Sequence, residues 1–392
     1  MTTVVRGGTV LTPGRTLAGH EVVLEGTRIA EVRPARTGPA TGEVVDAAGG
    51  WIVPGFVDVH VHGGGGHDVM DATPQALEAL SSTLARHGVT SFLATTVTAE
   101  RARTTAALAT VAAAAESLAG ARLLGTHLEG PYLAAAHRGA QNKDELRLPD
   151  LPEYAEWFDT GTVRLVTLAP ELDGALELIA SGTAKGVRFS AGHSGASETE
   201  LHAALDAGLR HATHAFNGMP SLHHRQPGLL GAILTDDRVR AELIADGVHV
   251  HPTVMDLLVR VKGPERVMLV SDAMRAAGMP DGTYELGGQR VTMQAGVCRT
   301  TEGGLAGSTL TLDRAVRNLV HRVGVAWGDA VTMATASPAD ALDRGDDLGR
   351  LAVGHRADVT VLDAQGHVRT TIVDGRIVHS RQEGPEYEPA RL

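Results

Sequence analysis

Hydrophobic and polar positions along the chain follow two different periods, and the change of period divides the chain into parts. In the first 50 residues, segments such as TTVVRGGTVL and HEVVLEGTRIAEVRP alternate apolar and polar side chains between Gly and Pro residues. This alternation is typical of short β-strands joined by turns. The same alternation of apolar and polar residues occurs near the C-terminus in ADVTVLDAQGHVRTTIVDGRIV. We therefore expect one small β domain to which both ends of the chain contribute strands.

Between these ends, short apolar runs alternate with amphipathic segments. Residues 73–88 and 197–209 are two of the amphipathic segments, and Thr73-Pro74 gives the first a helix N-cap followed by proline. The apolar runs read as buried strands at residues 51–62, 89–97, 121–129, 163–169, 187–193, 209–216, 239–246 and 266–273. Eight strands that each lead into a helix or loop predict an α/β protein with a (β/α)8 TIM barrel. An open doubly wound sheet is the alternative, but it would not bring residues from so many strand ends together.

These patterns predict the domain organisation. We expect residues 1–53 and 346–392 to form a discontinuous β-sandwich domain and residues 54–345 to form the catalytic barrel. The Gly-punctuated residues 282–308 predict a β excursion after the eighth barrel strand, and the last residues, RQEGPEYEPARL, predict a polar tail.

Composition and charge exclude several classes of partner. The 392-residue chain carries a formal charge of −11, so we expect no binding to nucleic acid or to an anionic membrane surface. It has no run of about 18 apolar residues that would predict a membrane span, and no signal-peptide pattern at its start. The single Cys298 excludes an intramolecular disulfide framework and fits a reducing compartment. We therefore expect a cytoplasmic protein.

Residue types that bind metals or transfer protons stand at the ends of five of the predicted strands. They are His60, His62, Glu129, His193, His214 and Asp272. In a barrel, the C-terminal ends of the strands form the catalytic face, so these side chains are expected to converge. A single residue of this kind could simply end a strand, but that explanation fits six coincident positions poorly.

The residue types suggest the chemistry. Imidazole and carboxylate suit Zn²⁺, Fe²⁺ or Mn²⁺, and no cysteine stands among them. Four histidines and a bridging glutamate could hold two ions about 3.5–4 Å apart, which would lower the pKa of a bound water towards about 7. Asp272 would then take a proton from that water and return it to a leaving amine.

Several motifs resemble one known family. PGFVDVHVHG, HLEGPYL, SAGHS, THAFNGM, ADGVHVHP, LVSDAM and GLAGS occur in order between about residues 50 and 345. They resemble the N-acetylglucosamine-6-phosphate deacetylases of the amidohydrolase superfamily. The resemblance implies that Glu129, His193 and His214 are core metal ligands and that Asp272 is the catalytic acid/base. Members with the HxH pair of His60 and His62 can load two ions, so one or two ions are expected here, with Zn²⁺ or Fe²⁺ preferred over Mn²⁺ or Co²⁺.

The resemblance also assigns substrate contacts. Arg225 matches the family's phosphate-binding arginine, which the neighbouring subunit of a homodimer can supply. Gln141 stands where some members carry a histidine near the acetyl group, and Gly218 stands where alanine is more common. The remaining expected substrate contacts are Ala140, Asn217, His249, Leu305, Ala306 and Gly307.

We therefore expect hydrolysis of N-acetyl-D-glucosamine 6-phosphate to glucosamine 6-phosphate and acetate, in amino-sugar catabolism. Hydroxide generated at the metal would attack the amide carbonyl, and Asp272 would act as general base and then as general acid. An amidohydrolase acting on another N-acyl or cyclic amide is one alternative. A sugar-phosphate sensor without catalytic activity is another.

Overall fold

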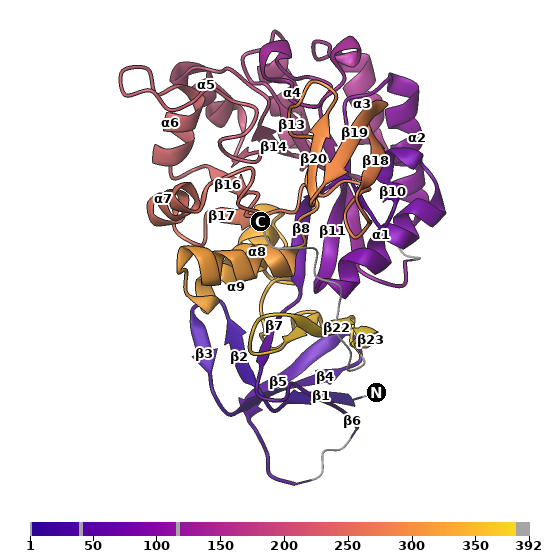
Figure 1. Cartoon of the computed structure of the whole chain (residues 1–392), viewed down its shortest axis with the longest axis vertical. Coiled ribbons are helices and arrows are strands. Elements are labelled where there is room, and N and C mark those ends of the chain that lie inside the picture. Colours follow the sequence, from indigo (N-terminus) through magenta and orange to yellow (C-terminus); the bar gives the residue numbers. More distant parts are fainter. Residues whose placement is uncertain (1, 39–41, 115–117, 382–392) are drawn as a thin grey trace.

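The computed structural model describes residues 2–38, 42–114 and 118–381 of the chain. A larger body of strands and helices lies above two small sheets, and the strands of both chain ends meet in the lower part (Figure 1). The predicted polar tail falls almost entirely on residues 382–392, which lie outside the described residues.

The larger body is the predicted barrel. Its eight strands form one parallel sheet in chain order: β8 (Phe56–Val61), β11 (Val89–Thr96), β12 (Arg122–Glu129), β13 (Val163–Leu168), β14 (Arg188–Ala191), β15 (His211–Ala212), β16 (Arg240–Leu243) and β17 (Val267–Leu269). The two edge strands meet through a parallel bridge between Val61 and Ala273. There the amide nitrogen of Asp272 donates to the carbonyl oxygen of His60 across 2.9 Å. The prediction of a barrel rather than an open sheet is confirmed.

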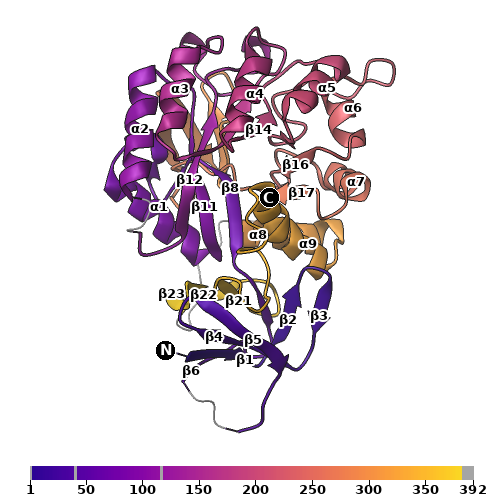
Figure 2. The same cartoon turned by 180° about the vertical axis from the view of Figure 1, so that it is seen from behind.

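Helices surround the strands (Figure 2). They are α1 (Pro74–Arg86), α2 (Arg101–Ala114), α3 (Leu151–Asp159), α4 (Ala175–Ala184), α5 (Glu198–Ala207), α6 (Gly228–Thr235), α7 (Pro252–Lys262), α8 (Leu312–Asn318), α9 (Trp327–Ala334) and α10 (Ala336–Ala341). The predicted cap of α1 is present, because the Thr73 hydroxyl accepts from the amide of Ala76 across 3.2 Å. Ser197 and Glu200 form a reciprocal capping box at the start of α5. In the described part of the chain, no helix is both long and apolar enough to cross a membrane.

The segment after β17 forms the predicted β excursion. Strands β18 (Gly282–Leu286), β19 (Gln289–Gln294) and β20 (Val297–Thr300) make an antiparallel sheet. The chain then returns to the barrel, where Ser308 bridges to Ala273. The excursion therefore begins and ends beside the strand end that carries Asp272.

Both ends of the chain build the smaller part. One sheet has the order β5-β4-β1-β6, from β1 (Thr2–Arg6), β4 (His20–Glu25), β5 (Arg28–Pro34) and β6 (Glu43–Asp46). The other has the order β23-β22-β21-β7-β2-β3, from β2 (Thr9–Thr12), β3 (Arg15–Leu17), β7 (Trp51–Pro54), β21 (Val359–Leu362), β22 (Val368–Val373) and β23 (Arg376–Ser380). Apolar side chains of both sheets share one buried cluster, which includes Val5, Val22, Ile52 and Val359. The predicted discontinuous β-sandwich is confirmed, while its bounds at residues 53 and 346 stay a prediction.

The predicted strand at residues 51–62 is wrong in one respect, because it is two strands. It divides at Gly55: β7 pairs with β2 and β21 in the terminal sheet, and β8 begins the barrel. A Cβ atom at position 55 would lie 2.1 Å from the hydroxyl oxygen of Thr90, so the close approach requires glycine. The boundary therefore depends on a contact between strands that the apolar pattern does not encode.

Candidate metal centre

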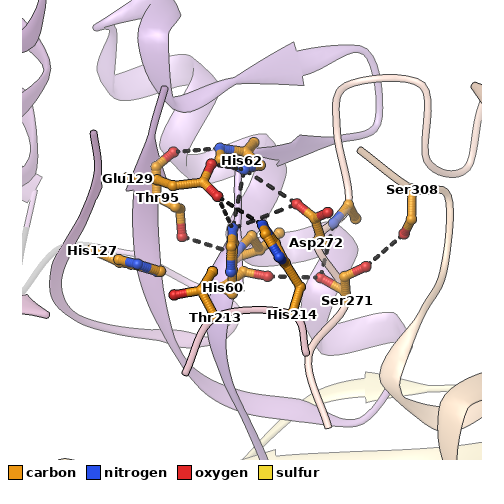
Figure 3. Close-up of polar contacts among 12 residues, drawn as sticks. His60, His62, Thr95, His127, Glu129, Thr213, His214, Ser271, Asp272 and Ser308 are labelled. Atoms are coloured by element: carbon orange, nitrogen blue, oxygen red, sulfur yellow. Dashed lines mark hydrogen bonds and ion pairs between the residues drawn. The ribbon is translucent and has the colours of Figure 1, made fainter. Parts of the chain in front are cut away.

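The six residues predicted at the strand ends converge in one buried cluster, and Figure 3 labels five of them: His60, His62, Glu129, His214 and Asp272. His60 lies in β8 and His62 directly follows it, while Glu129 is the last residue of β12. His193, His214 and Asp272 lie just beyond β14, β15 and β17 rather than within these strands.

The backbone of these last three residues is left-handed. The φ angles of His193, His214 and Asp272 are 48°, 28° and 47°. Such angles cost energy in residues other than glycine and concentrate at functional sites. Backbone hydrogen bonds hold Asp272 in place, because its nitrogen donates to His60 and its carbonyl oxygen accepts from the Ser308 amide across 2.7 Å. The bend after each strand turns the side chain towards the barrel axis.

A first group of candidate ligands surrounds one oxygen of Glu129. Its Oε1 lies 3.1 Å from Nε2 of His193 and 3.2 Å from Nε2 of His214. The two Nε2 atoms are themselves 3.1 Å apart. His193 donates from Nδ1 to the carbonyl oxygen of His137 across 2.8 Å, which leaves the Nε2 lone pair directed at the group. One oxygen and two nitrogens at this spacing fit a divalent cation.

A second group shares Glu129. The Nε2 atoms of His60 and His62 are 3.2 Å apart, and that of His62 lies 3.3 Å from Oε2 of Glu129. Oδ1 of Asp272 lies 3.2 Å from Nε2 of His62 and 3.5 Å from that of His60. Oε1 of Glu129 thus faces His193 and His214, with Nε2 of His60 at 3.6 Å, while Oε2 faces His62, so the carboxylate lies between the two groups, where it could bridge two ions.

The charges of the cluster depend strongly on one another. Burial alone would raise the pKa of Glu129, but His60 and the hydrogen bonds from His193 and His214 hold it well below its usual value. Burial opposes protonation of His62, yet its hydrogen bonds to Asp272 and Glu129 raise its pKa to about 9. Burial would raise the pKa of Asp272, but the hydrogen bond with His62 and the charges of His60, His62 and His214 together lower it to about 2. Imidazole binds a metal ion through a deprotonated nitrogen, so metal binding to these groups is coupled to the loss of protons.

Two buried residues next to the cluster did not enter the sequence prediction as ligands. Glu242, in β16, accepts from Nδ1 of His60 across 2.8 Å. His127 in β12 is hydrogen-bonded at both ring nitrogens, to the Val59 carbonyl oxygen at 3.0 Å and to the Thr167 hydroxyl at 2.7 Å. The signal for Glu242 was available in the sequence, because it is a single carboxylate within an apolar strand.

A cavity of about 420 Å³ opens over the cluster. Most of the predicted substrate contacts line it: Ala140, Gln141, Asn217, Gly218, His249, Leu305 and Gly307. Its wall also includes Val97, Ile244, Leu286, Thr300, Glu302 and Gly304, which the sequence prediction missed. Four of these lie on the β excursion or directly after it, a segment without ionisable clusters that would have drawn attention to it.

The structure does not bring two predicted contacts to this cavity. Ala306 is fully buried in an apolar cluster with Met274 and Cys298, so its side chain does not line the cavity. Arg225 is exposed, and its guanidinium lies 2.9 Å from the ring of His224. The loop directs the Arg225 guanidinium to the surface of the chain and not into the cavity of the same chain.

Both the nitrogen and the oxygen of the Gln141 side-chain amide form hydrogen bonds within the protein. Its Nε2 donates to Oε2 of Glu129 across 2.5 Å, and its Oε1 accepts from the amide of Thr98 across 2.8 Å. A side chain held in this way orients Glu129 even though it also lines the cavity.

Gly218 has a structural reason to be glycine. Its φ angle is 62°, and a Cβ atom there would lie 2.8 Å from Nδ1 of His193. At the other side of the cavity, Nδ1 of His249 lies 2.6 Å from a carboxylate oxygen of Asp246, and that hydrogen bond fixes the ring. Burial would lower the pKa of His249, but Asp246 raises it.

Comparisons with known proteins agree with this geometry. Residues 51–378 match the model of the Amidohydrolase family. The chain belongs to the amidohydrolase family. This amidohydrolase is 43% identical over 380 residues to the N-acetylgalactosamine-6-phosphate deacetylase of Escherichia coli O157:H7, covering 96% of this chain and 99% of that one. It is 43% identical over 341 residues to the N-acetylglucosamine-6-phosphate deacetylase of Vibrio furnissii, covering 86% and 85% of the two chains.

Solved structures extend the similarity. An N-acetyl-D-glucosamine-6-phosphate deacetylase mutant from Mycobacterium smegmatis, in complex with N-acetyl-D-glucosamine-6-phosphate, is 36% identical and superposes with a TM-score of 0.89 over 96% of this chain and 99% of that one. The enzyme from Pasteurella multocida is 28% identical, with a TM-score of 0.93 over 97% and 100% of the chains. Amidohydrolases are metal-dependent, and the two groups of histidine and glutamate described above fit that requirement.

Proposed function

We propose that this amidohydrolase removes the acetyl group from N-acetyl-D-glucosamine 6-phosphate, releasing glucosamine 6-phosphate and acetate. The observation that carries the proposal is the complete cluster of His60, His62, Glu129, His193, His214 and Asp272 beneath a cavity large enough for a sugar phosphate. Relatives at 33–43% identity that are named as deacetylases of this substrate support it.

The proposed cofactor is a divalent metal. Glu129, His193 and His214 would hold one ion, and His60 and His62 would hold a second together with Glu129. The donors are imidazole nitrogens and carboxylate oxygens, which suit Zn²⁺ or Fe²⁺, with Mn²⁺ or Co²⁺ as alternatives. When bound, such an ion activates water for hydrolysis and polarises a carbonyl group.

Asp272 is the proposed proton carrier. Its carboxylate is ionised at neutral pH and can therefore accept a proton, which is the first step of general base catalysis. Oδ1 faces the imidazoles of His60 and His62, so the carboxylate lies at the centre of the cluster. From there it would accept a proton from water and deliver it to the amine nitrogen that leaves the acetyl carbon.

The remaining wall of the cavity would hold the sugar phosphate. Asn217, Gly218 and His249 offer polar and backbone contacts, and Leu305 and Gly307 would close over the sugar. Ala140 and Gln141 line the side next to Glu129. Arg225 would bind the phosphate in the cavity of a neighbouring subunit, so we propose a homodimer.

A second substrate has a specific observation in its favour. The Escherichia coli O157:H7 relative that covers nearly the whole chain is named for N-acetylgalactosamine 6-phosphate, which differs only in the configuration at carbon 4. The same cluster would hydrolyse either acetamide, so the choice depends on contacts of the cavity wall with the sugar ring.

The test is acetate release from both 6-phosphates, from unphosphorylated N-acetylglucosamine and from an N-acetyl amino acid, with metal content measured on the same sample. We expect the glucosamine derivative to have the highest kcat/KM among the four. A preference for the galactosamine derivative would change the substrate but keep the reaction. A fully metallated protein that releases no acetate from either phosphosugar would refute the proposal and favour another amide substrate or a sensor.

A further inference from the structure

Glu242 is a buried carboxylate for which the proposed reaction has no direct use. It has no exposed surface, and its strand neighbours Ala241 and Leu243 are also fully buried. An ionised group in such a place is costly unless hydrogen bonds compensate for the lost water. Glu242 must therefore be held by, and act on, the groups that it touches.

Both hydrogen bonds made by Oε2 of Glu242 lead into the candidate metal centre. Oε2 accepts from Nδ1 of His60 across 2.8 Å and from the backbone nitrogen of His214 across 3.1 Å. The first bond fixes the proton of His60 on Nδ1. The lone pair of its Nε2 then points to Glu129 and Asp272, at 3.6 and 3.5 Å.

His60 differs from the other three histidines in the partner of its Nδ1. His193 donates to the carbonyl oxygen of His137 and His62 to that of Thr95, both of which are neutral acceptors. Nδ1 of His214 has no hydrogen-bond partner among the described residues. A carboxylate is the stronger acceptor and makes the opposite ring nitrogen a better metal ligand.

Glu242 could instead be read as a ligand itself, because it forms a third close group with His60 and His127. The hydrogen bonds argue against a metal there. Nδ1 of His60 already donates to Glu242, and both nitrogens of His127 bond to protein oxygens. Oε1 of Glu242 has no hydrogen-bond partner among the described residues, but the His60 nitrogen that faces Glu242 and both nitrogens of His127 are already hydrogen-bonded, so the group does not offer three free ligand atoms.

We propose that Glu242 is a positioning residue that fixes His60 for the second ion, which His60, His62 and Glu129 would share. The proposal rests on the metal centre proposed above but not on which sugar phosphate is hydrolysed. It predicts that substitution of Glu242 weakens the second ion more than the first, because Glu242 contacts the ring of His60 but only the backbone nitrogen of His214, a ligand of the first ion. The ring of His193 is held by the backbone carbonyl of His137, which the substitution leaves in place.

The experiment is a zinc titration of the full-length protein after removal of bound metal with a chelator. Metals per chain are measured by mass spectrometry, and affinities by competition with a chromophoric chelator. We expect two ions in the unaltered protein. Glu242→Leu should weaken the second ion about 10- to 100-fold, as is usual when the carboxylate partner of a ligating histidine is lost. The first ion should weaken by less, because Glu242 contacts only the backbone nitrogen of its ligand His214.

Two further variants keep the test decisive. Glu242→Gln retains an acceptor oxygen without the charge, so it should weaken the second ion by less than Glu242→Leu does, and it replaces that variant if leucine prevents folding. Asp313→Asn is the matched control, because it alters another buried carboxylate–histidine pair, with His87, outside the metal centre. This control should bind both ions normally.

Three results would overturn the proposal: binding of only one ion by the unaltered protein, equal weakening of both ions in Glu242→Leu, or no change in that variant. Acetate release is measured separately. A protein that binds two ions but hydrolyses neither phosphosugar would refute the proposed reaction while leaving the role of Glu242 intact.

Discussion

Asp272 combines three properties at a single residue: a left-handed backbone, a buried carboxylate and contacts with two imidazoles. Asp272→Asn keeps the shape but removes the ability to accept a proton. We expect kcat to fall about 10²- to 10⁴-fold, the range typical of lost general acid–base catalysis. Zinc content per chain should stay the same, because the four histidines and Glu129 remain. Acetate release and metal analysis on one preparation check both points, and an equally active variant would refute the role.

At the residue scale, the sequence predicted a residue's role correctly where the residue type alone allows few roles. Six histidines and carboxylates at five strand ends identify the cluster, since few other roles require them there together. Glu242 escaped notice because its function depends on His60, which lies 182 positions away along the chain and meets it only across the barrel. Ala306 was predicted at the cavity from its motif, but its backbone turns the methyl group into the apolar cluster.

At the scale of elements, the pattern predicted where strands and helices occur better than where they end. The apolar run at residues 209–216 contains a strand of only two residues, β15, because the following residues bend to direct His214 inwards. The spacing of apolar residues indicates which side chains are buried and not the backbone conformation. A buried bend directly after a strand therefore has the same sequence pattern as a longer strand. The cap of α1 was easier to predict, since Thr73 acts through a neighbour three residues away.

Two helices are joined by a buried ion pair that makes a testable contribution. Asp313 of α8 lies 3.3 Å from the ring of His87, the C-cap of α1. Burial would raise the pKa of Asp313, but the charges of His87 and Arg317 lower it to about 2. A carboxyl pKa that is lower in the folded state stabilises the protein above pH 4, and this contribution disappears as the pH falls towards 2.

Asp313→Asn should therefore lower the free energy of unfolding at pH 7 by about 2 kcal/mol, from the size of the pKa shift. Urea denaturation at pH 7 and pH 3 checks the sign: the difference between the two proteins should shrink at pH 3. A difference that grows on acidification would contradict this assignment.

At the scale of the whole molecule, the exposed position of Arg225 leads us to expect that two chains contribute to each active site. Arg225→Ala and Asp272→Asn should each be nearly inactive alone. If Arg225 serves the neighbouring subunit, mixed dimers contain one complete site, so an equal mixture that exchanges subunits should regain about a quarter of normal activity. No recovery after verified exchange would show that Arg225 acts within its own chain or not at all.

The barrel and the terminal sheets are connected by a buried ion network. Arg122, at the start of β12, lies 2.7 Å from a carboxylate oxygen of Asp358 and 2.7 Å from one of Asp374. Arg122→Met leaves Asp358 buried without its cation, so unfolding in urea should require about 3 kcal/mol less free energy. Arg101→Ala, which removes an exposed pair with Glu156, is the control and should cause no measurable change.

The overall architecture was predicted by counting: eight apolar runs with intervening helices leave few alternatives to a barrel. The order of strands in the two terminal sheets was not predicted, because strands as similar as β2, β7 and β21 can pair in many ways. Their arrangement is decided by packing around Val5, Val22, Ile52 and Val359, which lie far apart in the chain.

The position of β7 has a consequence for protein synthesis. The hydrogen-bonded strands of the sheet β5-β4-β1-β6 all lie within the first 46 residues, although its apolar side chains pack against Val359 and Ile372. The edge of β7, in contrast, pairs with β21, which begins at Val359 and is made only after the entire barrel. Throughout elongation this edge exposes unpaired backbone groups beside a growing chain, a condition that invites aggregation. Completion of the last strands therefore covers this edge, because β21 then pairs with β7.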